Sequence, residues 1–190
     1  MYYVFLDVDG VLNNNSTKDL IGRYLGLDDK NLAVLKRLMD KIYEEKGREN
    51  VSLILSSSWR IGISQHEFMA NPDELQTALK RKLKELDLVI DDITPHFCDY
   101  RGLEISTYLS DKEVDGYVVL DDDLFYDFKE FKTTAHLVRT SFMYGLQDKH
   151  IEKALELINK PLTEQEQKRL KEIKGRNILF NRLYGKGEKR

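Results

Sequence analysis

The stretch VFLDVDGVL, residues 4–12, determines how the rest of this 190-residue chain is interpreted. An apolar run typical of a buried strand leads directly into two aspartates, Asp7 and Asp9, and then into a glycine. Successive side chains of a strand point to opposite faces, so carboxylates two residues apart project to the same side. Two carboxylates held this close repel each other unless a cation lies between them or one is protonated. The stretch therefore predicts a metal ion, an acid and a nucleophile at the end of a core strand.

The remaining pattern alternates strands with amphipathic helices, which is typical of an α/β protein with a parallel sheet. The strands are predicted over residues 2–6, 51–55, 117–120 and 136–139, with a short one near 88–93. The periodic apolar positions predict helices over residues 31–46, 73–87, 102–110, 148–159 and 164–174. We therefore expect a three-layer, Rossmann-like domain over residues 1–160, followed over residues 161–190 by a helical, basic extension.

Composition limits the class of protein. Hydrophobic residues make up 41% of the chain and aromatic residues 10%, which is enough for a packed core. No run approaches the ~20 apolar residues of a membrane span, and the start of the chain does not resemble a signal peptide. We therefore expect a cytoplasmic protein with no membrane partner. Cys98 is the only cysteine, which excludes an intrachain disulfide and a cysteine-rich zinc site.

Charge is distributed unevenly along the chain. The net charge is −3, yet residues 168–190 contain nine Lys or Arg and two Glu, a net of +7. A basic tail on an acidic body is typical of proteins that bind nucleic acid or another phosphate-rich partner. The alternative is a solvated terminal helix, and the sequence alone leaves both open.

Polar residues gather where the predicted strands end, which is where open parallel sheets bind ligands. In chain order these residues are Asp7 and Asp9, Ser56-Ser57-Ser58-Trp59-Arg60, Arg101 at the start of a helix, and Asp121-Asp122-Asp123. Mg²⁺ prefers carboxylate oxygens and can bridge them to phosphoryl oxygens. A hydroxyl and a guanidinium can stabilise a phosphoryl group, one carboxylate can attack phosphorus, and a second can protonate the leaving oxygen. The set predicts phosphoryl transfer.

On these residues the sequence resembles the haloacid dehalogenase (HAD) superfamily of phosphohydrolases. VFLDVDGVL resembles its first motif, ILSSS its second, Arg101 its basic third and VVLDDD its acidic fourth, in the family's order. The resemblance implies a HAD-like fold, a Mg²⁺ cofactor and an aspartyl-phosphate intermediate, with Asp7 as the nucleophile and Asp9 as the general acid and base. More narrowly, SSSWR, RGLEISTYL and VVLDDD resemble the phosphatase-type HAD domain of bacterial and phage RNA-repair (Swiss Army Knife) proteins.

The resemblance also implies the rest of the site. The implied catalytic residues are Asp7, Asp9, Ser57 and Arg101, the metal ligands Asp7, Asp9, Asp121 and Asp122, the substrate contacts Gly10, Ser56, Ser58 and Arg60, and the outer-shell ligand Asp127. Two assignments stay open. Either Asp121 or Asp122 could bind the metal. The family's third motif is usually lysine, so Lys112 could take the place of Arg101.

The inserts that cover the site in many HAD proteins are short in this chain. About 15 residues separate Asn13 from the predicted helix cap near Asp28, and residues 61–100 leave room for one amphipathic helix. Segments below ~40 residues rarely form a core of their own. The predicted cap is therefore minimal, and the open site favours a macromolecular substrate such as the phosphate at a polynucleotide end.

Other functions would use similar residues. A metal-dependent nuclease shares the acids but does not need the Asp7-to-Gly10 pattern or the hydroxyls after the second strand. A phospho-acceptor signalling domain would place a lysine after its last strand, where this sequence has Arg139-Thr140-Ser141. A non-catalytic binding module would not need the complete set of acids. Phosphoproteins and small metabolites also remain as alternative substrates.

Overall fold

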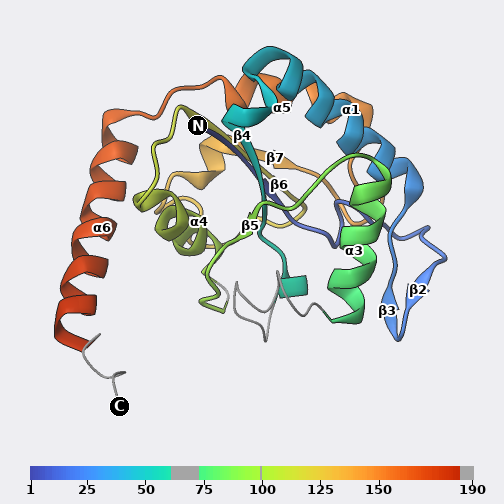
Figure 1. Ribbon diagram of the computed structural model, residues 1–190, viewed down its shortest axis with the longest axis horizontal. Coiled ribbons are helices and arrows are strands. Elements are labelled where there is room, and N and C mark those ends of the chain that lie inside the picture. Colours follow the sequence, from blue (N-terminus) through green and yellow to red (C-terminus); the bar gives the residue numbers. More distant parts are fainter. Residues whose placement is uncertain (61–72, 99, 185–190) are drawn as a thin grey trace.

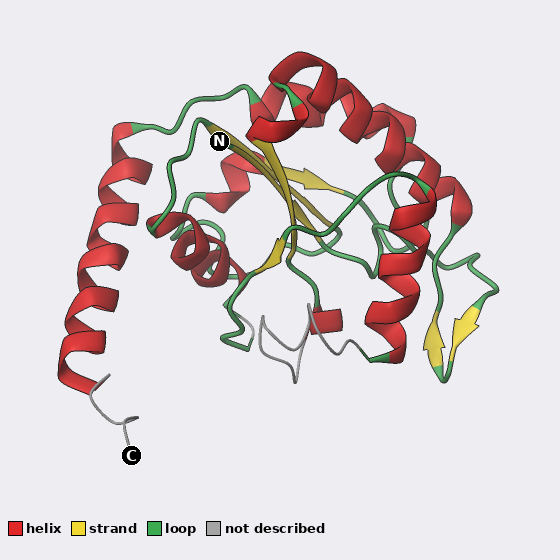
Figure 2. Ribbon diagram, viewed as in Figure 1, coloured by secondary structure: helices red, strands yellow, loops and turns green. Residues whose placement is uncertain are grey.

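A five-stranded sheet forms the centre of the computed structural model, which describes residues 1–60, 73–98 and 100–184, with 177–184 by their backbone only (Figures 1 and 2). The strands are β1 (Tyr2–Leu6), β4 (Val51–Leu55), β5 (Asp92–Ile93), β6 (Gly116–Asp121) and β7 (Leu137–Arg139). Their order is β5-β4-β1-β6-β7, so the strand that leads into the first two aspartates is central. Every pairing in this sheet is parallel, which confirms the predicted fold class.

Helices cover both faces of the sheet (Figure 1). They are α1 (Asp29–Lys46), α3 (Glu74–Glu85), α4 (Arg101–Ser110), α5 (Ile151–Ile158) and α6 (Glu164–Tyr184). Alternate residues of β1 serve the two cores. Val4 and Leu6 pack with apolar side chains of α1, α3 and α5, whereas Tyr3 and Phe5 pack with those of α4 and α6. The predicted three-layer arrangement follows from this alternation.

Local signals in the sequence fix the ends of the helices. The Asp28 carboxylate accepts from the backbone N–H groups of Lys30 and Asn31 and so caps α1, and Gly47, at φ +80°, ends that helix. Asp73 and Gln76 form a capping box at the start of α3. Each of these contacts satisfies N–H groups that the first turn of a helix leaves unpaired.

Several boundaries differ from the prediction. The segment after Asn13 forms an unpredicted antiparallel hairpin of β2 (Leu20–Ile21) and β3 (Tyr24–Leu25), because strands of two residues leave no periodic pattern. His136, predicted to start the last strand, instead ends a 3-10 helix over Thr133–His136. Helix α6 continues well past residue 174, because an exposed glycine such as Gly175 costs a helix only about 1 kcal/mol.

A buried polar chain attaches α6 to the sheet. His136 Nδ1 donates to the carbonyl of Tyr117 on β6 at 3.0 Å, and its Nε2 lies 2.9 Å from Glu166 Oε1. Glu166 also accepts from the backbone and hydroxyl of Thr163, and its N–H donates to Thr163 Oγ1, so the two residues form a capping box at the start of α6. Burial raises the pKa of Glu166, but the bonds from His136 and Thr163 outweigh it and lower the value to about 2. The division of the chain at residue 160 stays a prediction.

The insert that follows β1 is small, in agreement with the predicted minimal cap: it carries only the β2–β3 hairpin. In the second insert the structure describes α3, and residues 61–72 lie outside the described part of the chain. Among the described helices, none has the length and apolar character that crossing a membrane requires.

Candidate active site

Three neighbouring strands bring predicted site residues to one edge of the sheet. Leu6, the last residue of β1, pairs with Leu55 at the end of β4 and with Leu120 of β6. Beyond them, the N–H of Asp7 donates to the carbonyl of Leu120 at 2.9 Å, and the N–H of Ser56 donates to the carbonyl of Leu6 at 2.8 Å. Asp7, Ser56 and Asp121 therefore lie side by side at the carboxyl ends of the strands, although they are far apart in the sequence.

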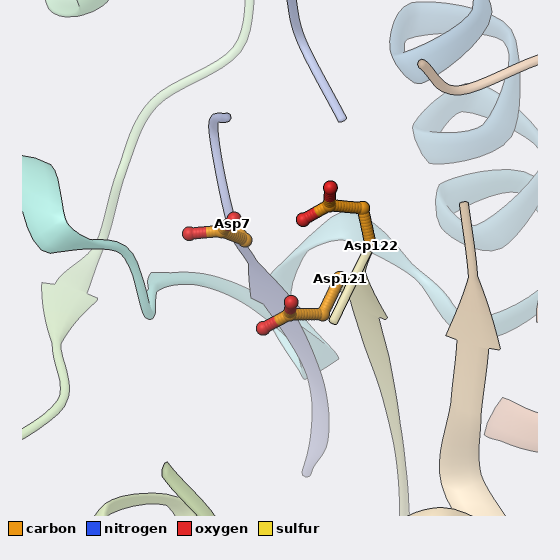
Figure 3. A group of neighbouring side chains, drawn as sticks. All are labelled: Asp7, Asp121 and Asp122. Atoms are coloured by element: carbon orange, nitrogen blue, oxygen red, sulfur yellow. The ribbon is translucent and has the colours of Figure 1, made fainter. Parts of the chain in front are cut away.

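Three carboxylates converge at this edge (Figure 3). Asp7, Asp121 and Asp122 each offer an oxygen, and these oxygens all lie within 4.8 Å of one another. Asp7 and Asp121 are buried, with 7% and 2% of their surface exposed, and Asp122 is half-buried. The structure brings both acids of the fourth motif, Asp121 and Asp122, to the same place, so both are positioned as candidate metal ligands. We call these three side chains the acidic cluster.

Gly10 allows Asp122 to reach the acidic cluster. Its φ of +67° is a conformation that residues with a Cβ rarely adopt, and a Cβ added there would lie 2.2 Å from Asp122 Oδ2. Its N–H donates to Asn13 Oδ1 at 2.9 Å, and its carbonyl accepts from Thr140 Oγ1 at 2.7 Å. The glycine of the first motif is therefore needed for close approach as well as for the turn.

The pKa values of all three carboxyl groups in the acidic cluster are raised. Burial raises the pKa of Asp7 well above its ordinary value, and the charge of Asp121 raises it further, while Arg101 and a hydrogen bond with Ser57 oppose the rise. Burial likewise raises the pKa of Asp121 to about 6 and also raises that of Asp122. Buried carboxylates with too little positive charge beside them gain from a cation or a proton.

Arg101 is the basic residue at the acidic cluster. Its Nη1 lies 3.7 Å from Asp7 Oδ1 and 4.0 Å from Asp121 Oδ2, and it donates to Ser56 Oγ at 3.2 Å. Lys112, the alternative cation, follows the other end of α4, where its ammonium lies 5.1 Å from the Tyr108 ring centroid. The start of α4 thus supplies the positive charge nearest to the acids.

Besides Ser56, the side chains of Glu104 and Phe125 contact Arg101. Glu104, fully buried one turn along α4, has an oxygen 3.6 Å from Arg101 Nε, and the Phe125 ring centroid lies 5.0 Å from its guanidinium carbon. Asp127, which the sequence suggested as an outer-shell metal ligand, is bonded to the start of α4. Its carboxylate accepts from the N–H groups of Gly102 and Leu103 at 3.1 and 2.9 Å, so it ties the loop after β6 to the first turn of α4.

Arg60 differs from its predicted setting as a substrate contact. The side chain is buried and donates to the carbonyls of Ser57, Thr94 and Pro95 and to Glu104. Burial and the charge of Arg101 lower its pKa to about 10, against the attraction of Glu104. These four hydrogen bonds go to groups of the protein, so Arg60 joins the loop after β4 to the segment before α4.

The hydrogen bonds of the Asp9 carboxylate come from Asn13 and from the loop after β4. The carboxylate accepts from Asn13 Nδ2 at 2.8 Å, from Trp59 Nε1 at 3.1 Å and from the Ser58 hydroxyl at 3.5 Å. Ser57 is fully buried and hydrogen bonds with Asp7. Ser58 is exposed. The two aspartates of the first motif are therefore held in different surroundings.

The donors fit a hard divalent cation. Asp121 Oδ1 accepts from the Asp123 N–H at 3.0 Å, whereas Asp121 Oδ2 is buried and has no hydrogen-bond partner among the described residues. Carboxylate oxygens are the ligands that Mg²⁺ prefers. An unsatisfied buried carboxylate oxygen beside two further acids is what such a site requires.

The sequence did not indicate several residues that hold the site together. Asn13, Trp59 and Glu104 position Asp9, Arg60 and Arg101 through contacts described above. Glu104 had one local signal, because it lies three residues after Arg101 and so shares its helix face. Asn13 and Trp59 had none, since their partners depend on how separate loops meet.

Comparison with protein families identifies the chain. Residues 3–151 match the family model described as the HAD domain in Swiss Army Knife RNA repair proteins. No curated protein and no solved structure matches the chain. The matched segment spans the central sheet apart from Tyr2, and every residue of the site described above. The chain therefore belongs to the family of HAD domains found in Swiss Army Knife RNA repair proteins.

Proposed function

We propose that this protein is a Mg²⁺-dependent phosphomonoester hydrolase that acts through an aspartyl-phosphate on Asp7. The observation that carries the proposal is the acidic cluster, in which a buried oxygen of Asp121 that has no hydrogen-bond partner among the described residues lies beside Asp7, Asp122 and Arg101. The family description is that of a HAD domain, which supports a phosphohydrolase at this site.

In the first step, a carboxylate oxygen of Asp7 forms a bond to phosphorus and the ester P–O bond breaks. Asp9 gives a proton to the departing oxygen, which leaves as an alcohol. The separate surroundings of Asp7 and Asp9 suit this division of roles. Asp7 shares its site with Arg101, whereas Asp9 is held by donors on the loop after β4.

In the second step, Asp9 takes a proton from a water molecule whose oxygen attacks phosphorus. The bond between phosphorus and Asp7 breaks, which releases inorganic phosphate and restores the carboxylate. Arg101 and Ser57 contact the phosphoryl oxygens throughout, because charge-assisted donors stabilise the negative charge that these oxygens carry. Ser56 supports Arg101, and Ser58 supports Asp9.

Asp7, Asp121 and Asp122, with the backbone carbonyl of Asp9, would hold the magnesium ion. When bound, Mg²⁺ offsets the repulsion between the carboxylates and the anionic substrate. The pKa values of the three side chains, all raised by burial, support a cation at this position.

The proposed substrate is a phosphate at a polynucleotide end. Only the β2–β3 hairpin occupies the insert after β1, so a large substrate has access to the acidic cluster from that side. The family is named for RNA repair proteins. The basic residues in 168–190 would add long-range attraction to a nucleic acid.

The test is release of inorganic phosphate from a generic aryl phosphate, with and without Mg²⁺. We expect turnover that depends on Mg²⁺ and is abolished in Asp7→Asn. Asp40→Asn is the matched control, because Asp40 forms only an exposed ion pair on α1, and such pairs contribute ~1 kcal/mol at most. Full activity of Asp7→Asn would rule out the covalent route. Cleavage of an internal phosphodiester without release of inorganic phosphate would favour the nuclease.

A further inference from the structure

Two exposed tyrosines are next in sequence to residues that hold the site together. Tyr100, the residue before Arg101, is 47% exposed, and Tyr126, on the loop after β6, is 65% exposed. Their ring centroids are 5.2 Å apart in an edge-on arrangement. Exposed, rigid aromatic rings supply contact area at low entropic cost and are typical of binding surfaces.

The two tyrosines are joined to the site by the contacts that hold Arg101. Phe125, next to Tyr126, lies against the Arg101 guanidinium, and Asp127 anchors the same loop to the first turn of α4. Arg101 in turn reaches Asp7. The tyrosine pair is therefore held in a fixed position relative to the residue proposed to attack phosphorus.

An open, mainly apolar hollow continues from the tyrosines along the loop after β6. It has a volume of about 500 Å³. The lining side chains are Leu124, Phe125, Tyr126, Lys129, Lys132, Thr134 and Ala135. Leu124 is 48% exposed, and Lys129 is exposed as well. Neither Lys129 nor Lys132 forms an ion pair with a residue that the structure describes. We call Tyr100, Leu124, Tyr126, Lys129 and Lys132 the aromatic–lysine surface.

We propose that the aromatic–lysine surface binds the single-stranded polynucleotide that leads to the phosphate at the acidic cluster. Successive bases would stack on Tyr100 and Tyr126 and against Leu124, while Lys129 and Lys132 contact the backbone phosphates. Aromatic platforms beside cations bind single strands without reading their sequence, because every base has a flat face and every linkage is an anion. This inference rests on the proposed function, and it adds the residues that make the site prefer a polymer to a free phosphate ester.

The apolar and the charged parts of the surface together favour a nucleic acid over the other candidates. A small phosphate ester has no extension that would reach the hollow. An acidic peptide would use the lysines but gain little from the rings of Tyr100 and Tyr126. A single strand offers a flat face and a negative charge at each repeat, and so complements both parts of the surface.

The test is binding of a fluorescent single-stranded oligonucleotide with a terminal phosphate, measured by anisotropy. All proteins carry Asp7→Asn, so that the substrate is not consumed. We expect Tyr126→Ala to weaken binding at least about fivefold, the loss of one stacked base, and Tyr126→Phe to restore it. We expect Lys129→Ala to lower the slope of log K against log salt by ~0.7, the value for one phosphate contact to a single strand.

Tyr24→Ala is the matched control, since Tyr24 is an exposed aromatic on the β2–β3 hairpin, across the molecule from α4 (Figure 1). It should bind like the parent. In the active protein, Tyr126→Ala should slow the release of inorganic phosphate from the oligonucleotide more than that from an aryl phosphate.

Two outcomes overturn the proposal. One is equal binding by Tyr126→Ala and the parent, and the other is no binding of the oligonucleotide by either protein, which would turn attention to a peptide partner. If the protein without any substitution does not hydrolyse an aryl phosphate, the result has a different meaning. It contradicts the proposed function, whereas the binding measurement, which needs no turnover, still decides the role of this surface.

Discussion

Replacing Asp121 with asparagine tests the electrostatics of the acidic cluster directly. The change removes one buried charge while keeping the shape of the side chain, and the carboxamide oxygen can still accept from the Asp123 N–H. Without metal, the folded protein must keep Asp7 and Asp121 close together, with the guanidinium of Arg101 3.7 Å from the one and 4.0 Å from the other. We therefore expect Asp121→Asn to stabilise the metal-free protein at neutral pH and to destroy activity.

The pKa of Asp121 gives the magnitude. Burial raises it to about 6 from an ordinary value of 3.8. Each pKa unit corresponds to ~1.4 kcal/mol, so the ionised side chain costs the folded state up to about 3 kcal/mol at pH 7. A folded-state pKa above the unfolded one means that this cost is absent below pH ~4 and grows as the pH rises to ~6. The advantage of Asp121→Asn should follow the same course.

The assay is urea unfolding followed by circular dichroism, in chelator and in Mg²⁺, at pH 4 and pH 7. In chelator at pH 7 the variant should unfold at a midpoint higher by up to roughly 1–3 M, given m values of about 1–3 kcal/mol/M. At pH 4 the two proteins should differ little. Mg²⁺ should stabilise the parent far more than the variant, because a ligand that binds only the folded state stabilises it.

Asp115→Asn serves as the control, since the Asp115 carboxylate is exposed and forms an ion pair with the N-terminal amine. It should change neither the pH dependence nor the response to Mg²⁺. If Asp121→Asn is no more stable than the parent in chelator at pH 7, the proposed repulsion within the acidic cluster is wrong. If Mg²⁺ stabilises both proteins equally, Asp121 is not a ligand.

Two further predictions concern the turn after β1 and the attachment of α6. Gly10→Ala should lose most of its Mg²⁺-dependent phosphate release, because a Cβ at φ +67° would lie 2.2 Å from Asp122 Oδ2. Gly175→Ala is the control and should keep full activity, because there is open space around Gly175. A fully active Gly10→Ala protein would contradict the close approach of Asp122 to Gly10. Glu166→Gln should destabilise the protein at pH 7 by up to about 3 kcal/mol, because the pKa of Glu166 is lowered from 4.5 to about 2. This contribution is present above pH ~4.5 and is lost as the pH falls toward 2. In urea unfolding, the free energies of unfolding of the variant and the parent should therefore converge in acid. A difference that does not change with pH would refute the ionic role of Glu166.

The sequence by itself determined the fold and the place of the site. Alternation of strands with amphipathic helices fixed an α/β sheet, because each strand covered by helices must be apolar on both faces. The acids after residues 2–6 and 117–120 could be assigned to one edge, since parallel strands end on the same side. The helix starts at Asp28 and Asp73 also depended on near neighbours alone.

Only the tertiary structure decided how the side chains are shared among tasks. Local sequence presents Arg60, Arg101, Lys112 and Asp127 as equivalent polar residues near strand ends. The fold turns Arg60 inward onto Glu104, directs Arg101 to Asp7, leaves Lys112 at the far end of α4 and uses Asp127 to anchor that helix. Each outcome depends on partners 25 to 94 residues away in the sequence or on the length of a helix. The contacts of a side chain are set by its burial and by which separate loops meet around it. No local sequence pattern predicts the burial or the meeting of these loops.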